Sequence, residues 1–297
     1  MSASDTCSST SAGRDEPMFA TGSAVLGWVL VEVPGAWGED AIHASAFGEF
    51  APRHWKDELK RRQIRVVCIR SHERVGATGV RVYACAARRP GLQPAPLWRC
   101  EVPSLADVVP SVRELRVDQR PGREWEREHA QLLLVCTNGR HDQCCANLGR
   151  PLVRALRESR WANQVWECSH IGGDRFAPNL VVLPDSLYFG RVDPDSASSV
   201  LSALDDGRIE VGHFRGRTSF SLAEQAVEHF VRRDLAVDAA DGVVIESRSV
   251  DGSFVVKLDD RRVSVRVRSR MVSVAEPLTC KGRGNQLVPV FDLVSIT

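Results

Sequence analysis

The sequence predicts an α/β fold in which helices flank sheets of mostly buried strands. Apolar, strand-like runs alternate with helix-like segments over residues 18–127, and the same kind of alternation begins again over residues 128–207. From residue 208 the pattern changes to one amphipathic helix followed by a hairpin. We therefore expect two similar α/β units followed by a small C-terminal α+β region, 208–297.

Composition and charge narrow the class of protein. The chain has 297 residues, of which 43% are hydrophobic and 26% are charged, so it can bury a sizeable core. A formal net charge of +1 gives no bulk attraction to nucleic acids or membrane surfaces, and neither is expected as a partner. No apolar stretch is long enough to span a bilayer.

The first 17 residues form a polar, Ser-rich segment that we expect to be a disordered tail. It lacks the basic start and apolar run of a secretory signal, which favours a soluble, cytoplasmic protein. The run VLGWVLVEV then has the near-continuous apolar character of a buried strand, and Pro34-Gly35 ends it. The elements expected in this first unit are strands 25–33, 64–70, 80–86 and 97–102 and a helix at 52–62.

The turn sequence Arg120-Pro121-Gly122 separates the second unit from the first. Its expected strands are 131–136, 164–168, 179–183 and 187–192, and its expected helices are 151–159 and 194–204. Pro151 suits a helix start because the first turn needs no N–H donor there. The order β-α-β-β-β-α fits a small thioredoxin-like sheet with flanking helices.

The last region opens with a capping box, Ser221 to Glu224. The helix that follows places five apolar side chains on one face: Ala223, Ala226, Val227, Phe230 and Val231. Segments 253–258 and 261–268 then flank two aspartates as a hairpin. In the second segment valines alternate with polar residues, which is typical of a half-buried strand.

Four residues carry the most distinctive chemistry: Cys136, Cys145, Cys168 and His170. The first two are separated by a polar loop between a strand and a helix, and the others precede a Gly-Gly turn. Thiolates with an imidazole suit iron–sulfur or zinc. Tight C-x2-4-C knuckles are absent, which favours iron–sulfur over zinc. A thiol oxidoreductase using Cys144 or Cys145 is a further interpretation, weakened by the lack of C-x-x-C.

The remaining cysteines have plainer interpretations. Nine cysteines, an odd number, in a reducing compartment argue against a disulfide framework. Three lie in apolar strands and are expected to be core thiols: Cys68, Cys85 and Cys100. Cys7 lies in the tail and is expected to be inert, and Cys144 to pack beside its neighbour. Cys280 lies in a polar loop that could fold back on the site. The pair His141-Asp142 is expected in a solvated loop, with hydrogen bonding near the cluster as the alternative.

The stretches LLVCTNGRHDQCC and CSHIGGDRFAPNLVVLPDSLYFGRV resemble the sucrase/ferredoxin-like family (sucraseferredoxin), a branch of the thioredoxin-like [2Fe–2S] ferredoxins. The resemblance is strongest over residues 128–192. It implies a thioredoxin-like fold, a [2Fe–2S] cluster and one-electron transfer. It does not imply sucrose hydrolysis, and the sequence has no G-x-S-x-G motif or paired carboxylates that would favour a hydrolase.

The resemblance also implies which residues hold the cluster. Eukaryotic relatives use two Cys and the two His of an H-x-G-G-H motif. Cys136 and Cys145 match the two Cys, and His170 matches the first His, whereas Asp174 stands at the second His. Cys168 lies two residues before His170, on the same side of an extended segment, and is a softer donor than a carboxylate. The expected ligands are Cys136, Cys145, Cys168 and His170, with Asp174 as the alternative fourth ligand and Cys144 or Cys280 less favoured.

These observations together predict a soluble [2Fe–2S] protein for one-electron transfer or redox sensing. They favour an electron carrier, working with an unidentified reductase or oxidase, over an enzyme with its own substrate. The alternatives are a thioredoxin-like thiol oxidoreductase and a zinc-stabilised interaction module.

Overall fold

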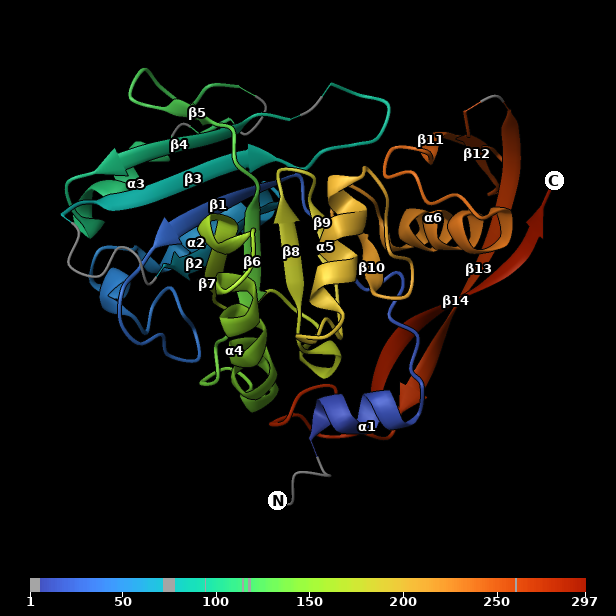
Figure 1. The fold of residues 1–297 in the computed structure, drawn as a ribbon, viewed down its shortest axis with the longest axis horizontal. Coiled ribbons are helices and arrows are strands. Elements are labelled where there is room, and N and C mark those ends of the chain that lie inside the picture. Colours follow the sequence, from blue (N-terminus) through green and yellow to red (C-terminus); the bar gives the residue numbers. More distant parts are fainter. Residues whose placement is uncertain (1–5, 72–77, 94, 114, 117–118, 260) are drawn as a thin grey trace.

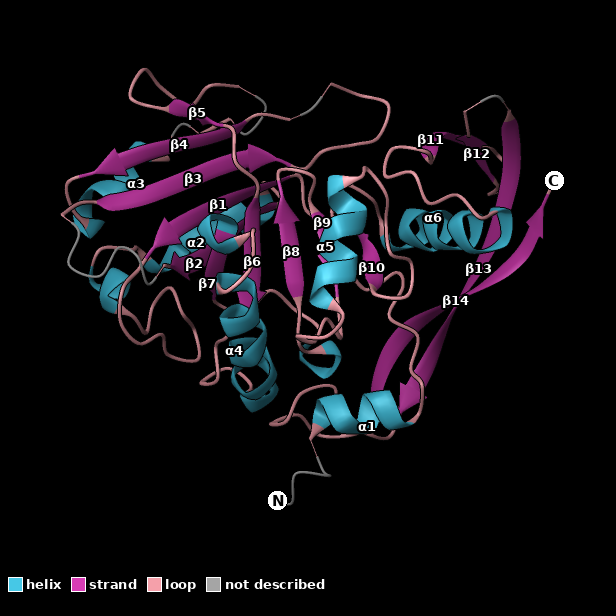
Figure 2. Ribbon diagram, viewed as in Figure 1, coloured by secondary structure: helices cyan, strands magenta, loops and turns pink. Residues whose placement is uncertain are grey.

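The computed structural model describes residues 6–71, 78–93, 95–113, 115–116, 119–259 and 261–297. Ten strands form one large mixed sheet, and four more form a second, smaller sheet near the C-terminus (Figure 1). The α/β class with helices flanking the strands is therefore confirmed (Figure 2).

The first half of the large sheet has the order β2-β1-β3-β4-β5. Its strands are β1 (Gly27–Glu32), β2 (Ile64–Arg70), β3 (Val80–Ala86), β4 (Leu97–Val102) and β5 (Glu126–Glu128). Strands β1 and β2 are parallel, and β3 and β4 continue the sheet antiparallel. Two helices accompany them, α2 (Arg53–Arg61) and the short α3 (Val108–Ser111). The strands expected at 64–70, 80–86 and 97–102 are confirmed.

The second half has the order β7-β6-β8-β9-β10. Its strands are β6 (Leu132–Cys136), β7 (Val165–Cys168), β8 (Leu180–Leu183), β9 (Leu187–Phe189) and β10 (Phe214–Arg217). The first four strands of each half thus share one order and one pattern of directions. Two copies of one structural unit would show this repetition. That each unit has a thioredoxin-like fold stays a prediction.

The two halves are joined edge to edge by β2 and β7. These strands pair antiparallel, with Ile69 opposite Cys168 and Arg70 opposite Glu167. An Arg70–Glu167 ion pair of 2.8 Å reinforces the junction. The expected division at residue 127 therefore falls within one continuous sheet.

Helices α4 (Gln143–Arg157) and α5 (Ala197–Asp205) cover one face of the second half (Figure 2). Helix α4 begins eight residues before the predicted 151–159, because the Asp142 side chain caps it by accepting the Cys144 N–H at 2.8 Å. Pro151 lies inside the helix rather than at its start. Cys145 therefore belongs to the first helical turn and not to the loop before it.

The C-terminal region contains helix α6 (Leu222–Leu235) and the sheet β11-β12-β13-β14. Its strands are β11 (Val244–Arg248), β12 (Phe254–Lys257), β13 (Arg262–Val274) and β14 (Gln286–Ile296). The predicted capping box from Ser221 to Glu224 is confirmed. Strands β13 and β14 form a long ribbon whose far end reaches helix α1 (Cys7–Gly13) (Figure 1).

Helix α1 lies in the N-terminal segment for which we expected a disordered tail, and that prediction is wrong for residues 7–13. Thr6 caps it, and Cys7, Ser8 and Ser11 are buried against the rest of the protein. A short polar sequence can be ordered in this way when its partners are supplied by distant segments. Sequence pattern does not reveal such partners.

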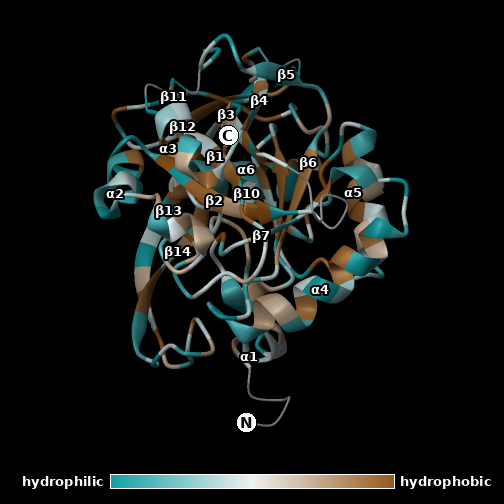
Figure 3. Cartoon of the chain, turned by 90° about the vertical axis from the view of Figure 1, so that its left-hand side faces the viewer, coloured by the Kyte–Doolittle hydropathy of each residue, from teal (hydrophilic) through white to brown (hydrophobic). Residues whose placement is uncertain are grey.

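The core separates into layers on the two faces of the large sheet, whose strands are largely apolar (Figure 3). On β6 the side chains alternate. Leu133 and Val135 pack under α4 and α5, whereas Leu134 and Cys136 face the opposite layer, which also contains Cys145 and Cys168. The alternation thus directs the cysteine at the end of β6 toward the other candidate ligands.

A fully buried ion cluster attaches α6 to β10. Glu228 accepts hydrogen bonds from Arg217 at 3.2 Å and from Arg232 at 2.8 Å, and none of the three side chains is exposed. Buried guanidinium groups are stabilised when an anion and hydrogen-bond acceptors compensate their charge.

We expect Glu228→Gln to lower the free energy of unfolding by about 3 kcal/mol or more, because the buried Arg217 and Arg232 would both lose their anionic partner. Urea denaturation at neutral pH measures the change. Asp234→Asn, on the exposed end of the same helix, is the control and should change stability by less than about 1 kcal/mol. Equal effects of the two variants would contradict the role assigned to the cluster.

Candidate metal centre

Three cysteine sulfurs are brought together at the carboxyl ends of two parallel strands. Cys136 ends β6 and Cys168 ends β7, and the two residues are direct neighbours in the β6·β7 register. Cys145 projects from the first turn of α4, and its thiol and that of Cys168 lie against the Cys136 sulfur. All three side chains are buried. The structure thus assembles the three cysteines that the sequence analysis selected.

These contacts shift the pKa values of the three thiols in opposite directions. Hydrogen bonds from the thiols of Cys145 and Cys168 hold the pKa of Cys136 well below its usual value, against the effect of burial. The pKa of Cys145 is raised by the same hydrogen bond and by burial. The pKa of Cys168 is raised mainly by burial and, to a lesser degree, by its hydrogen bond with Cys136. The metal-free centre therefore favours one thiolate, at Cys136, stabilised by two thiols.

His170 extends the group of donors toward the surface. Its Nδ1 lies 2.9 Å from Oδ1 of Asp174, which begins the short 3-10 helix η5 (Asp174–Phe176). The same carboxylate oxygen accepts a hydrogen bond from the Cys145 thiol at 3.3 Å. Burial works against ionisation of Asp174, but its contacts with His170 and Cys145 hold its pKa below the usual value.

His141 joins the centre although the sequence analysis expected it in a solvated loop. Its ring stacks on that of His170 with the centroids 3.7 Å apart, and its Nε2 lies 3.6 Å from Oδ2 of Asp174. Asp142, expected in the same loop, is fully buried. The start of α4 at residue 143 explains the burial of Asp142, which caps the helix, and the N-cap character of Asp142 is the signal in the sequence that could have revealed it.

The donor set fits a transition-metal centre. Three sulfurs and an imidazole are soft or intermediate donors, with a carboxylate beside them. Nδ1 of His170 is buried 2.9 Å from Oδ1 of Asp174, the position of a carboxylate that orients a ligating imidazole. This contact leaves Nε2 as the ring nitrogen that could bind a metal.

A buried arginine supports the turn that follows His170. Gly172 and Gly173 both have positive φ, 96° and 80°, and a Cβ at Gly173 would lie 2.2 Å from the guanidinium of Arg215. Arg215 donates to the Gly172 carbonyl at 3.0 Å and to the Asn179 side chain at 2.7 Å. The Gly-Gly sequence is thus needed for close approach of the turn to this arginine.

Arg215 also affects the electrostatics of the centre. Burial lowers its pKa to about 10, and no carboxylate of a described residue forms an ion pair with it. Its positive charge interacts with Asp174, the carboxylate beside His170. No local pattern predicts this contact, because Arg215 lies 41 residues beyond Asp174 along the chain.

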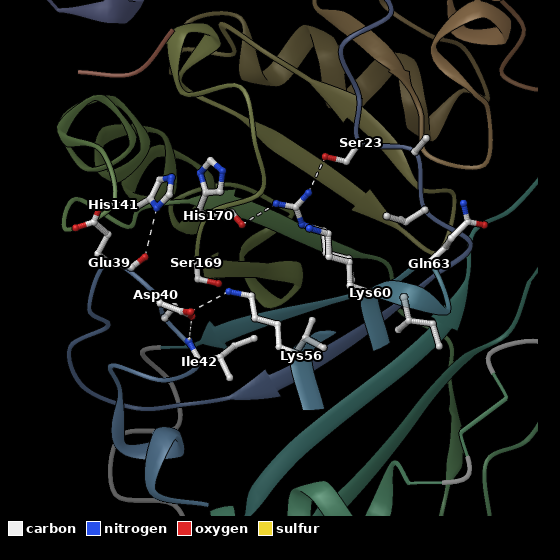
Figure 4. A pocket seen from close by; sticks show the side chains of 16 residues that line it. Ser23, Glu39, Asp40, Ile42, Lys56, Lys60, Gln63, His141, Ser169 and His170 are labelled. Carbon is white, nitrogen blue, oxygen red and sulfur yellow. Dashed lines mark hydrogen bonds and ion pairs between the residues drawn. The ribbon is translucent and has the colours of Figure 1, made fainter. Parts of the chain in front are cut away.

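A cavity of about 550 Å³ opens beside the centre and is lined by His141 and His170 (Figure 4). Lys56 and Lys60 from α2 project into it from the opposite wall. Arg65 donates to the His170 carbonyl at 3.0 Å. Because the cysteines are buried while both histidine rings are partly exposed, the histidines form the side of the centre that faces solvent.

The other cysteines lie outside this group. Cys68, Cys85 and Cys100 are buried in the apolar core, as predicted. Cys144 does not pack on the centre but meets Cys7 and Cys280 in a separate cluster. Neither Cys144 nor Cys280 therefore takes part in the centre formed by Cys136.

These features define a mixed α/β protein with a cysteine- and histidine-rich centre that could hold a metal. A family model for sucrase/ferredoxin-like proteins matches residues 21–216, and the chain belongs to this family. The match includes the whole of the large sheet apart from the last residue of β10. It excludes helix α1 and the C-terminal sheet.

The chain is similar to three curated relatives that are all named altered inheritance of mitochondria protein 32. The chain is 29% identical to the Candida glabrata protein over 101 residues, 32% identical to that of Eremothecium gossypii over 103 residues, and 29% identical to that of Saccharomyces cerevisiae over 112 residues. Each match covers 29–33% of this chain and 32–34% of the relative. The chain thus spans about a third of the length of these proteins.

No solved structure matches this chain. In the part of the chain that the structure describes, every helix is too short or too polar to cross a bilayer.

The close packing of α4 on β6 gives a test of how the centre is positioned. A Cβ at Gly149 would lie 2.2 Å from the Cys136 carbonyl oxygen. We expect Gly149→Ala to push α4 away from Cys136, lowering stability by about 1–3 kcal/mol and reducing bound metal. Thermal unfolding and metal analysis measure both effects.

Gly13→Ala is the matched control, since a Cβ there meets nothing within 4 Å. Unchanged stability and metal content in Gly149→Ala would show that this close approach does not position Cys145.

Proposed function

We propose that this protein carries single electrons through a [2Fe–2S] cluster held by Cys136, Cys145, Cys168 and His170. The observation that supports this most strongly is the grouping of three buried sulfurs at the ends of β6 and β7, with the partly exposed imidazole of His170 linked to Cys145 through Asp174. When bound, such a cluster accepts and releases one electron. Membership of the sucrase/ferredoxin-like family agrees with that chemistry.

Cys168 is the preferred fourth ligand because of its neighbours. It is paired with Cys136 in the β6·β7 register, and its thiol lies against the Cys136 sulfur. Asp174 instead contacts His170 and Cys145, which is the usual place of a carboxylate that orients a ligating imidazole. Three thiolates and an imidazole also make a softer donor set than one that includes a carboxylate.

The partly exposed histidines suggest how electrons and protons enter. His170 lines the cavity beside the buried sulfurs, so its ring offers a route from the centre to solvent. Stacked His141 restricts that ring, and Asp174 holds it from the inner side. His170 can therefore take up a proton when the centre gains an electron.

The cavity supports a redox partner of complementary charge. Lys56, Lys60 and Arg65 line it together with Asp40 and Glu39, giving a mixed but basic wall. We infer a reductase or oxidase that presents an acidic surface to this cavity.

All nine cysteines are free, which suits the reducing conditions of the cytosol and supports a cytoplasmic location.

Metal analysis tests the proposal directly. We expect the full chain, purified without oxygen, to be brown and to contain about two irons and two acid-labile sulfides. Cys136→Ser and Cys145→Ser should lose most of the iron, whereas the core variant Cys100→Ser should keep it. A colourless chain whose thiols reduce a disulfide substrate would indicate a thiol oxidoreductase, and zinc lost with Cys136 would indicate a zinc module.

The same measurement separates the two candidate fourth ligands. We expect Cys168→Ser to lose iron or shift the visible spectrum strongly, and Asp174→Asn to keep iron with a smaller shift. The reverse order would identify Asp174 as the ligand.

Ligation by histidine predicts a potential that depends on pH. Where the reduced centre binds one proton on His170 and the oxidised centre none, the midpoint potential should fall by about 59 mV per pH unit. Protein-film voltammetry measures this slope, and His170→Cys should flatten it. A wild-type potential that stays constant from about pH 6 to pH 9 would exclude a titrating histidine ligand.

A further inference from the structure

A second cysteine cluster lies at the start of α4, built from segments far apart in the sequence. Cys7 comes from α1, Cys144 from α4, and Cys280 from the loop between β13 and β14. The sulfur of Cys144 lies 3.6 Å from that of Cys7 and 3.3 Å from that of Cys280. The third distance, from Cys280 to Cys7, is 3.5 Å. Three sulfurs therefore form a nearly equilateral triangle.

A carboxylate completes the group. Asp142 is fully buried, and its oxygens lie 3.7 and 3.9 Å from the Cys7 sulfur. One oxygen accepts the Cys144 N–H at 2.8 Å and the other accepts the Cys280 N–H at 2.6 Å. Two backbone donors thus fix the carboxylate with lone pairs left for a cation. One ligand atom from each of the four side chains lies within 4.8 Å of all the others.

We propose that Cys7, Cys144, Cys280 and Asp142 form a structural zinc site, separate from the centre around Cys136. A tetrahedral zinc ion with Zn–S bonds of about 2.3 Å holds its sulfurs about 3.8 Å apart. The three sulfur distances are a few tenths of an ångström shorter, so small side-chain shifts would admit the ion. Four protein donors leave no open position, which is the arrangement of structural rather than catalytic zinc.

The geometry disfavours the other uses of three thiols. A disulfide would bring two sulfurs to about 2 Å and leave the third thiol and the carboxylate without a role. A two-iron cluster needs its ligands in two separated pairs, whereas these sulfurs are mutually equidistant. One small tetrahedral cation uses all four groups.

The start of α4 favours the thiolate that zinc requires. Cys144 lies in the first turn of a 15-residue helix, where the helix dipole stabilises negative charge. Hydrogen bonds from Cys7 and Ser8 lower the pKa of Cys144 to about 5 against the effect of burial. Zinc binding would then release the protons of the other two thiols.

The site would attach α1 and the β13–β14 loop to the metal centre. Cys7 and Cys280 lie outside the region shared with the family, residues 21–216. Their partner Cys144 adjoins Cys145, whose sulfur contacts Cys136. An Arg14–Glu276 ion pair joins the same two segments. Zinc would thus hold α1 and the β13–β14 loop over the turn that positions Cys145.

Zinc and iron measured together on the full chain test this proposal independently of the proposed function. We expect about one zinc per chain. Cys7→Ser and Cys280→Ser should lose zinc and keep iron, while Cys136→Ser should lose iron and keep zinc. Cys100→Ser is the control and should keep both metals. A chain with zinc but no iron would contradict the electron-carrier proposal and leave the zinc site standing.

Cobalt substitution tests the ligands if a variant folds poorly. The wild-type chain with Co²⁺ in place of zinc should show sulfur-to-cobalt charge-transfer absorption, and Asp142→Asn should weaken cobalt binding by about 10-fold or more. Zinc well below one per chain, a disulfide among the three cysteines, or zinc retained in both Cys7→Ser and Cys280→Ser would overturn the proposal.

Discussion

The parallel pairing of β6 with β7 is the constraint on which the centre depends. Its register places Cys136 directly beside Cys168, each at the end of its strand. The side-chain alternation of β6 then turns the Cys136 sulfur away from the body of α4 and toward the layer that contains the other two cysteines. A shift of one residue would move Cys136 to the opposite face. The antiparallel β2·β7 pair holds this register by making β7 an interior strand.

Asp142 has a comparable importance at the start of α4. By capping the helix it fixes Cys144 and Cys145 in one turn, and their side chains leave that turn in different directions. Cys145 reaches the centre at the strand ends, whereas Cys144 reaches Cys7 and Cys280. Adjacent cysteines therefore serve two clusters, and displacement of this turn would affect both.

Local pattern predicted much of the large sheet and the main candidate ligands. Strands 64–70, 80–86 and 97–102 have clear apolar runs bounded by turns, and Cys136, Cys145 and Cys168 do meet at the ends of strands. Pro151 misled the prediction of α4, because proline usually marks a helix start and here lies within the helix. Contacts between distant segments had no local signal, so α1, Arg215 and the Cys7 cluster could not be foreseen.

Electron paramagnetic resonance of the chemically reduced protein tests the central proposal most directly. A reduced [2Fe–2S] cluster bound through His170 should give a one-electron signal with hyperfine coupling to a ring nitrogen, and that coupling should disappear in His170→Cys while the signal remains. We expect this coupling in the wild-type protein. Absence of any signal from iron-replete protein, or a signal unchanged by His170→Cys, would contradict a cluster ligated by Cys136, Cys145, Cys168 and His170.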